Sequence, residues 1–363
     1  MKKTLLSFVL ALSLLFVSCG EQAPESVRNV IYMIGDGMGL AHVSMLQVEN
    51  QFEPTSFDRA EQVALITTRS MNNRVTDSAA AGTALATGKK TNNSMLGQSP
   101  EGEAYESMIA KASKSGFATG LVVTCYLQHA TPAAFYAHQP KRYMVEEITD
   151  DLLHSNIDLL VGGGRKWLKQ ECAEGKTYFE AFAEKGYTLA DSLEAFEQVT
   201  SCPVLAAVSE KHLEKPAERG NYLPNAVRKS LELLKNAPSE KGFLVMIEGS
   251  QIDYAAHRND SQWLLDELRD FDRAVGVAMD FADKNAGTLV VVVADHETGG
   301  LTLPAVDADF TQAENGVQYL YTTQGHSGSM VPVYLYGTGA DRIHGVMDNT
   351  ELSQQISALL GLE

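Results

Sequence analysis

The stretch LVVVVADHETGG, residues 289–300, indicates the fold class, because an entirely apolar run ends abruptly in acidic, histidine and glycine residues. Leu289–Val293 has no polar face, which is typical of a strand covered by helices on both sides. Similar short apolar runs recur along the chain, at Val30–Ile34, Gly120–Thr124, Ile157–Val161, Phe243–Ile247 and Val331–Tyr336. We therefore expect a buried, mostly parallel sheet.

Helical patterns fill the gaps between these runs. They cover residues 103–115, 225–236 and 261–284, and the last carries an apolar stripe from Leu264 to Met279. Alternation of strands and helices over most of the chain predicts a doubly wound α/β fold whose sheet is flanked by helices. We expect residues 28–363 to form a single domain, with the more polar stretch 165–222 as an elaboration at one edge of the sheet.

The N-terminus has the pattern of an export signal. Two lysines precede an apolar run from Leu5 to Val17 that is too short to span a membrane comfortably, and a Ser-Cys-Gly triplet follows. We expect residues 1–18 to be a signal peptide and Cys19 to become the lipidated first residue, with residues 19–27 as a tether. The protein is then exported and anchored at the periplasmic or cell-surface side of a bacterial membrane. The alternative is an ordinary secreted protein.

Charge and cysteine content narrow the functional classes. The formal net charge of −17 argues against nucleic-acid binding by the surface, and an anionic substrate would need cations within the site itself. Export leaves a disulfide between Cys172 and Cys202 open, whereas Cys125 ends an apolar run and is expected to be a buried thiol.

Residues able to bind metals or transfer protons follow four of the six apolar runs. Asp36 lies in GDGMG after the first run, a HAT triplet ending at Thr131 follows the second, and Glu248 follows Phe243–Ile247. Asp295 and His296 come directly after Leu289–Val293. Because ligands of such folds bind outside the carboxyl ends of the strands, these residues predict a site there.

Carboxylate and imidazole pairs in this set suit zinc. EGSQIDYAAH (248–257) places Asp253 and His257 four residues apart in a helical pattern, so both lie on one face. Asp295 and His296 form a second pair, and QGHSGS (324–329) adds His326. Mixed oxygen and nitrogen donors suit Zn²⁺, and there are enough for two ions. Taken singly, each motif is equally compatible with an ordinary surface or turn.

A third set of donors contains only oxygen. Asp36, Thr131 and Glu248 suit Mg²⁺, which prefers carboxylate and other hard oxygen ligands. Paired metal ions in hydrolytic enzymes stabilise the attacking and the leaving oxygen at the same time.

A candidate nucleophile lies in VTDSAAAGTA (75–84). Ser78 stands at the start of a helix-forming run, next to Asp77. One interpretation is a helix N-cap; the other is a reactive hydroxyl at a helix N-terminus, where free N–H groups attract anions. A serine hydroxyl needs a metal or a base to ionise it, and the donors above supply metals.

The ordered motifs NVIYMIGDGMG, VTDSAAAGTALATGKKT, HATPAAFYAH, EGSQIDYAAH, VVVADHETGG and GHSG span residues 29 to 328. In this order, they resemble the metal-dependent alkaline phosphatases that use a serine nucleophile. The resemblance implies that the chain is a phosphoric monoester hydrolase with the alkaline phosphatase fold and a short crown or insert region. It further implies two Zn²⁺ ions, one Mg²⁺ ion and a phosphoserine intermediate, with broad leaving-group specificity and an alkaline optimum.

The same resemblance implies a role for each matching residue. Ser78 is the nucleophile, and Arg142, in HQPKRY, grips the phosphate. The implied ligands are Asp36, Asp295 and His296 for the zinc that activates Ser78; Asp253, His257 and His326 for the zinc at the leaving group; and Asp36, Thr131 and Glu248 for magnesium. Asp77 stands beside the nucleophile and is expected to support it.

Two positions depart from the best-known bacterial pattern. His129 stands where many relatives have an aspartate, and Tyr254 where they have a lysine or histidine. Both are expected to lie behind the magnesium ligands and to weaken Mg²⁺ retention. A homodimer is the family expectation, although the short connection between His296 and His326 leaves little room for the insertion that caps the site in some relatives. His138, His154, His212 and His344 show no partner pattern and receive no role.

The expected substrates are small-molecule phosphate monoesters. Two alternatives stay open on the sequence: a phosphodiesterase or sulfatase of the same superfamily, and a catalytically silent lipoprotein that captures phosphate or zinc. The intact Asp77-Ser78 pair argues against a silent binder, because a protein that only binds needs no nucleophile.

Overall fold

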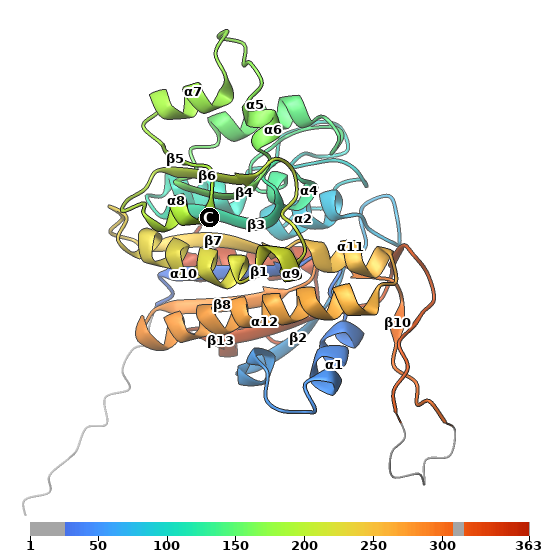
Figure 1. The fold of residues 1–363 in the computed structure, drawn as a ribbon. Coiled ribbons are helices and arrows are strands. Elements are labelled where there is room, and N and C mark those ends of the chain that lie inside the picture. Colours follow the sequence, from blue (N-terminus) through green and yellow to red (C-terminus); the bar gives the residue numbers. More distant parts are fainter. Residues whose placement is uncertain (1–25, 308–315, 363) are drawn as a thin grey trace, which may run out of the picture.

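A computed structural model describes residues 26–307 and 316–362, and a ten-stranded sheet forms its centre (Figure 1). The strand order is β14-β2-β13-β8-β1-β7-β3-β4-β6-β5, and β13 alone runs antiparallel to its neighbours. The strands are β1 (Asn29–Gly35), β2 (Gln62–Thr67), β3 (Ala118–Tyr126), β4 (Leu159–Gly163), β5 (Thr188–Ala190), β6 (Val204–Ser209), β7 (Phe243–Gly249), β8 (Thr288–Val293), β13 (Val331–Gly337) and β14 (Gly345–Asp348). The expectation of a mostly parallel sheet is confirmed.

All six apolar runs form strands, with ends that differ by a few residues. The run expected at Ile157–Val161 begins instead at Leu159, whereas the run expected at Gly120–Thr124 extends to Tyr126. Every residue of β8 is buried, as expected for a central strand covered on both faces. Strands β2, β5, β6 and β14 have no counterpart among the six runs.

Helices flank the sheet, and Figure 1 shows α10 and α12 lying across its near face. Their bounds are α1 (Leu40–Glu49), α2 (Ser78–Thr87), α3 (Met108–Lys114), α4 (Ala130–Ala133), α5 (Val145–His154), α6 (Arg165–Leu168), α7 (Tyr178–Glu184), α8 (Leu193–Glu197), α9 (Pro216–Arg219), α10 (Tyr222–Lys235), α11 (Gln251–His257), α12 (Ser261–Lys284) and α13 (Asn349–Leu360). Two short 3₁₀ helices, η1 (Ser56–Arg59) and η2 (Ala340–Arg342), complete the set.

The expected helix boundaries hold for one helix and shift for two. Helix α12 covers residues 261–284 as expected, and its N-cap Asp260 accepts a hydrogen bond from the backbone of Trp263. The helix expected over 103–115 begins only at Met108, because the Ser107 side chain caps it there. The helix expected over 225–236 begins earlier, at Tyr222, since a proline is tolerated in a first helical turn.

Residues 165–222 contribute β5 and β6 to the edge of the sheet beside β4, together with helices α6 to α9. Cys172 and Cys202 lie in this stretch, and both are free thiols, so the disulfide that the sequence left open is not formed. Cys172 occupies the turn before α7, whereas Cys202 lies two residues before the start of β6. Cys125 is free and buried, as expected.

A hairpin projects from the body beyond the carboxyl end of β8 (Figure 1). It pairs β10 (Leu301–Thr302) with β11 (Leu320–Tyr321), and a second short pair joins β9 (Glu297–Thr298) to β12 (His326–Ser327). Both strand pairs involve the connection between His296 and His326, which the sequence predicts to be too short for a large insertion over the site. The predicted signal peptide and the predicted lipidation site Cys19 lie outside the described residues. Among the described residues, no helix combines the length and the apolar character needed to cross a membrane.

Candidate active site

The carboxyl ends of four neighbouring strands bring the predicted metal ligands together. Strand β1 leads into Asp36, β7 contains Glu248 opposite Ile34, and β8 leads into Asp295 and His296. Strand β3 pairs with β7 and leads into the loop that precedes α4. The sheet topology therefore places residues from distant parts of the chain at one edge, as the parallel arrangement predicts.

Ser78 lies at the start of α2 and faces this cluster. It is the first residue of the helix and is 2% exposed, and its Oγ lies 3.2 Å from Nε2 of His296. The N-cap is Asp77, which accepts a hydrogen bond from the backbone N–H of Ala80. Because Asp77 caps the helix, the Ser78 hydroxyl is not used for capping.

The first donor cluster consists of Asp36, Asp295 and His296. One donor atom of each lies within 4.8 Å of the others, and all three residues are buried. Asp295 Oδ1 accepts hydrogen bonds from the backbone N–H groups of Gly37 and His296, both at 3.0 Å. Its Oδ2 and both carboxylate oxygens of Asp36 have no hydrogen-bond partner, and buried oxygens of this kind suit a cation.

The second donor cluster consists of Asp253, His257 and His326. Asp253 and His257 come from the same face of α11, and His257 Nε2 lies 3.2 Å from Asp253 Oδ2 and 3.2 Å from His326 Nε2. Asp253 and His326 also form a group with His296 within 4.8 Å. The ring of His326 stacks on that of His296 at a centroid distance of 3.6 Å, which places the two clusters side by side.

Backbone carbonyls fix the orientation of two of these imidazoles. His257 Nδ1 donates to the carbonyl of Gln324 at 2.5 Å, and His326 Nδ1 donates to the carbonyl of Thr76 at 2.8 Å, with the ring protons assigned from these partners. A neutral imidazole that donates from Nδ1 in this way has its Nε2 lone pair available to a metal ion. Zinc-binding histidines in proteins are oriented in the same way.

The third donor set is made of Asp36, Thr131 and Glu248. All three side chains are fully buried, and Thr131 Oγ1 and Glu248 Oε1 have no hydrogen-bond partner. Behind them, the hydroxyl of Tyr254 lies 3.3 Å from His129 Nε2, so the two residues that depart from the bacterial pattern contact each other. The unsatisfied oxygens fit a hard divalent cation.

Burial makes the ionised form of these carboxylates unfavourable when no cation is nearby. Burial, together with the neighbouring carboxylates, raises the pKa of Asp36 well above its ordinary value. Burial also raises the pKa of Asp295 and of Glu248 to about 7 in each case. For Asp253 burial acts in the same direction, but the hydrogen bond from His257 and the nearby histidines lower its pKa overall. Divalent cations would neutralise this concentration of charge.

Arg142 supplies a fixed positive charge beside the serine. Its Nη1 lies 3.2 Å from Asp77 Oδ2, and only 15% of its side chain is exposed. A cavity of about 260 Å³ lies beside Ser78 and Arg142, and the histidines of the second cluster also line it. Its lining consists of Ser78, Tyr126, His129, Arg142, Tyr143, Asp253, Tyr254, His257 and His326. A small phosphate group in this cavity would meet Ser78 and Arg142 together.

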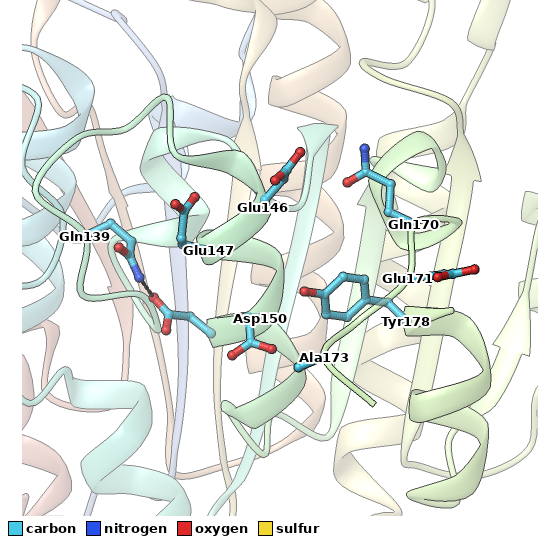
Figure 2. Close-up of a pocket in the computed structure, with 9 residues that line it drawn as sticks. Gln139, Glu146, Glu147, Asp150, Gln170, Glu171, Ala173 and Tyr178 are labelled. Atoms are coloured by element: carbon cyan, nitrogen blue, oxygen red, sulfur yellow. Dashed lines mark hydrogen bonds between the residues drawn. The ribbon is translucent and has the colours of Figure 1, made fainter. Parts of the chain in front are cut away.

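A larger cavity of about 580 Å³ lies between α5 and α7, and Figure 2 shows its acidic lining. The carboxylates of Glu146, Glu147, Asp150, Asp151 and Glu171 surround it, and it contains none of the predicted site residues. Its charge would repel a phosphate ester. The smaller cavity beside Ser78 is therefore the candidate active site.

The sequence analysis gave no role at the site to three residues that lie near it. Thr298 donates to Asp253 Oδ1 at 2.6 Å and lies 3.2 Å from His296 Nδ1. His212 Nε2 lies 3.3 Å from the Tyr254 hydroxyl, and Cys125 lies beside Glu248. Only Thr298 belongs to a recognised motif; neither His212 nor Cys125 carries a local signal that could have identified it.

Comparison with known proteins agrees with this geometry. The family model for alkaline phosphatase matches residues 27–316. Alkaline phosphatase 4 of Bacillus subtilis is 29% identical over 94% of this chain and 91% of its own length, and streptomycin-6-phosphate phosphatase of Streptomyces griseus is 30% identical over 94% and 92%.

Solved structures show the same relationship. The alkaline phosphatase of the Antarctic bacterium TAB5 superimposes with a TM-score of 0.86 at 32% identity, over 93% of this chain and all of that one. The alkaline phosphatase of a psychrophilic Shewanella species superimposes with a TM-score of 0.84 at 29% identity, over 92% of this chain and 99% of that one. The chain therefore belongs to the alkaline phosphatase family and is a hydrolase of phosphate monoesters.

Proposed function

We propose that the chain hydrolyses phosphate monoesters through a phosphoserine formed on Ser78, at a centre of two zinc ions and a third divalent ion. The observation that carries this proposal is the position of the Ser78 hydroxyl, 3.2 Å from His296 Nε2 and on the same cavity as Arg142. A phosphate-binding lipoprotein without turnover would have no use for a hydroxyl placed in this way.

The donor clusters provide the ligands for these ions. Asp36, Asp295 and His296 would hold the zinc next to Ser78, and Asp253, His257 and His326 would hold the second zinc. Asp36, Thr131 and Glu248 would hold the third ion, for which an oxygen-only set predicts Mg²⁺. When bound, the ions promote ionisation of the serine hydroxyl and stabilise the charge on the leaving oxygen.

The chain's own residues position the reacting groups. The Ser78 hydroxyl gives up its proton to solvent, and Oγ attacks phosphorus and forms an Oγ–P bond. The bond to the leaving oxygen breaks, and that oxygen takes a proton from water. Water then attacks phosphorus, which releases phosphate and restores the Ser78 hydroxyl. Arg142 holds the non-bridging oxygens in both steps, and the start of α2 adds favourable N–H groups.

The charge of the site favours a monoester over a diester or a sulfate ester. Three divalent ions and Arg142 outweigh four ligand carboxylates and an ionised Ser78, which leaves a positive site suited to a dianion. Recognition through the phosphate alone supports broad leaving-group specificity, and the need for an ionised serine supports an alkaline optimum. A TAB5 phosphatase variant with aspartate in place of a histidine has been solved with magnesium bound, which supports metal dependence here.

Location and assembly follow from the sequence pattern and the family. We propose export, lipidation of Cys19 and attachment to a bacterial membrane at its periplasmic or cell-surface side. Labelling with a palmitate analogue, with a Cys19→Ala control, tests the anchor. The family also carries the expectation of a homodimer, which the molar mass from light scattering tests.

The proposed reaction is tested with p-nitrophenyl phosphate, before and after chelation by EDTA, and with Zn²⁺ and Mg²⁺ restored singly and together. We expect loss of activity on chelation and recovery that requires both metals. Parallel rates on bis-p-nitrophenyl phosphate and p-nitrophenyl sulfate should be far lower. A rate on either of these that exceeds the monoester rate would overturn the proposal.

A further inference from the structure

The acidic cavity between α5 and α7 takes no part in the proposed reaction. It shares no lining residue with the active-site cavity, and no lysine, arginine or histidine lines it. Helix α5 and the segment between α6 and α7 supply its carboxylates, which are those of Glu146, Glu147, Asp150, Asp151 and Glu171. Its volume of about 580 Å³ lies in the range that small organic ligands occupy.

A buried tyrosine directs an unpaired hydroxyl into this cavity. Tyr178, the first residue of α7, is 6% exposed, and its hydroxyl makes no hydrogen bond to the described residues. Figure 2 shows the hydroxyl pointing toward the side of the cavity that Glu147 and Asp150 form. Burial, followed by the charge of Asp150, raises the pKa of Tyr178 to about 12, and Glu146 and Glu147 contribute in the same direction. A polar group this deeply buried and without a partner indicates a place for a ligand.

The chain itself leaves most of the negative charge of this cavity unbalanced. Among the described residues, no lysine or arginine forms an ion pair with Glu146, Glu147 or Glu171. Asp150 lies 3.5 Å from Nδ1 of His154, in an exposed pair that is ionic only when the histidine is protonated. A concave surface with charges of one sign raises the local concentration of ions of the opposite sign. The cavity is therefore suited to a cation.

The spacing of the carboxylates does not suit a single metal ion. In the part of the chain that the structure describes, groups of three or more acidic, histidine or cysteine donors within 4.8 Å of one another occur only around the active site. A calcium or magnesium ion needs several oxygens at roughly 2.0–2.6 Å. A longer ligand that carries several positive charges can reach carboxylates that lie farther apart. The spacing and the volume therefore both favour an organic cation.

We propose that this cavity binds a linear alkyl polyamine. Its ammonium groups pair with carboxylates on the two sides of the cavity, those of Glu147 and Asp150 on α5 and that of Glu171 before α7. Since an ammonium group has only donors, it also satisfies the free oxygen of the Tyr178 hydroxyl. The methylene segments between the charges pack against the Tyr178 ring. This binding site does not depend on the proposed phosphatase reaction.

Calorimetric titration of the metal-loaded full chain with spermidine tests the site, in about 0.15 M salt so that weak surface attraction is screened. Wild type is compared with Glu147→Gln/Asp150→Asn and with the control Asp341→Asn/Glu351→Gln. The control removes the same charge from exposed positions on η2 and α13, which pack against β13 and β14. We expect one equivalent to bind to wild type and control with equal Kd, and at least about tenfold more weakly to the cavity variant.

Two outcomes of this titration would overturn the proposal. One is a wild type that shows no saturable binding of spermidine, which decides the matter even if the cavity variant does not fold. The other is equal weakening in both double variants, which would mean that spermidine responds only to the net charge of the protein.

Tyr178→Phe and competing cations test the geometry of the site. Because the phenyl ring keeps the packing and loses only the hydroxyl, we expect this variant to unfold at the wild-type temperature and to bind spermidine about three- to tenfold more weakly. Unchanged binding would remove the hydroxyl from the site and contradict the proposal. Displacement of spermidine by an equal concentration of Ca²⁺ or Mg²⁺ would show a metal site instead. None of these readouts uses turnover, so loss of phosphatase activity with intact spermidine binding would refute the proposed reaction alone.

Discussion

Ser78 Oγ and His296 Nε2 lie 3.2 Å apart, although 218 positions separate these residues in the chain. Ser78 opens α2 and His296 follows β8, so the contact joins a helix start to a strand end. His296 belongs to the first donor cluster, and its ring also lies within 4.8 Å of donor atoms of Asp253 and His326 in the second. The hydroxyl consequently faces the part of the site where metal ions would act on it.

Replacement of Ser78 by alanine tests the nucleophile. Because His296 is the one hydrogen-bond partner of the hydroxyl among the described residues, Ser78→Ala should fold normally, with its free energy of unfolding within about 0.5 kcal/mol of wild type. The turnover of p-nitrophenyl phosphate should fall by roughly a thousandfold or more, since loss of a nucleophile removes the covalent route. Ser113→Ala, in the short helix α3, is a matched control and should keep full activity. Retention of more than a tenth of the activity by Ser78→Ala would rule out the phosphoserine route.

Asp77 has two separable roles that two substitutions resolve. Its Oδ1 caps α2, and its Oδ2 accepts hydrogen bonds from the Ser94 N–H at 3.0 Å and from Arg142 at 3.2 Å. Asp77→Asn keeps the cap but loses the charge that orients Arg142, so KM should rise roughly tenfold at a cost of about 1 kcal/mol in stability.

Asp77→Ala removes the cap as well and should cost about 2 kcal/mol, with a similar rise in KM. Steady-state kinetics and chemical unfolding of both variants separate the two roles. Equal stability of the Asn and Ala variants would show that the cap contributes nothing.

Zinc should stabilise the folded chain. The folded site concentrates buried carboxylates whose pKa values are raised by burial, notably Asp36, Asp295 and Glu248, and a cation relieves their mutual repulsion. A ligand at about a hundred times its Kd stabilises the native state by about 2.7 kcal/mol. Thermal unfolding of the chelated chain should therefore shift upward with added zinc. The double variant Asp295→Asn/His296→Asn should show a much smaller shift, and an equal shift would place the zinc elsewhere.

The central strands could be predicted because a strand buried on both faces consists of consecutive apolar residues, which are visible in the sequence. Every residue of Thr288–Val293 is buried, and no polar position interrupts the pattern. Two of the missed strands lack this signal: β2 alternates buried and partly exposed positions, and β5 has only three residues. Strand β6 carries an apolar run, Val204–Val208, that the sequence analysis did not use. The reversed direction of β13 is also invisible in its sequence, since a short apolar run does not specify parallel or antiparallel pairing.

The site was predictable where ligands share a local motif. Asp253 and His257 lie four residues apart on one helix, and their contact at 3.2 Å follows from that spacing. His212 and Cys125 come into contact with the site only when distant segments fold together, so no local pattern marks them. Arg142 was identified only through the family resemblance, because its neighbours in the sequence do not distinguish it from a surface arginine.

A buried ion pair distant from the active site should control stability. Arg219 Nη2 lies 2.6 Å from Glu267 Oε2 and 2.7 Å from Asp270 Oδ2, and none of the three side chains is more than 4% exposed. Arg219→Met leaves both buried carboxylates without their counter-ion, so the free energy of unfolding should fall by about 3–5 kcal/mol. Arg228→Met breaks a pair with Glu197 that is much more exposed and should cost at most about 1 kcal/mol.

The cost of Arg219→Met should depend on pH. Burial raises the pKa of Glu267, and Arg219 opposes that rise, so its loss raises the pKa further. A carboxyl group with a raised pKa in the folded state stabilises the fold at low pH and loses that contribution as pH rises through the folded pKa. The stability deficit should therefore be largest near neutral pH and shrink toward about pH 5. Urea unfolding at both values measures this, and a deficit independent of pH would contradict it.

His129→Asp tests how the third site chooses its ion. His129 contributes a nitrogen near Glu248, and its ring is held by Tyr254. An aspartate would supply oxygen where the imidazole now lies, so magnesium should bind more tightly and added Mg²⁺ should stimulate the purified variant less than the wild type. Elemental analysis after dialysis measures the retained magnesium. His138→Asp is the control, because that side chain bonds the carbonyl of Gly97 outside the donor clusters. If His129→Asp kept the wild-type dependence on Mg²⁺, the imidazole would have no part in metal selection.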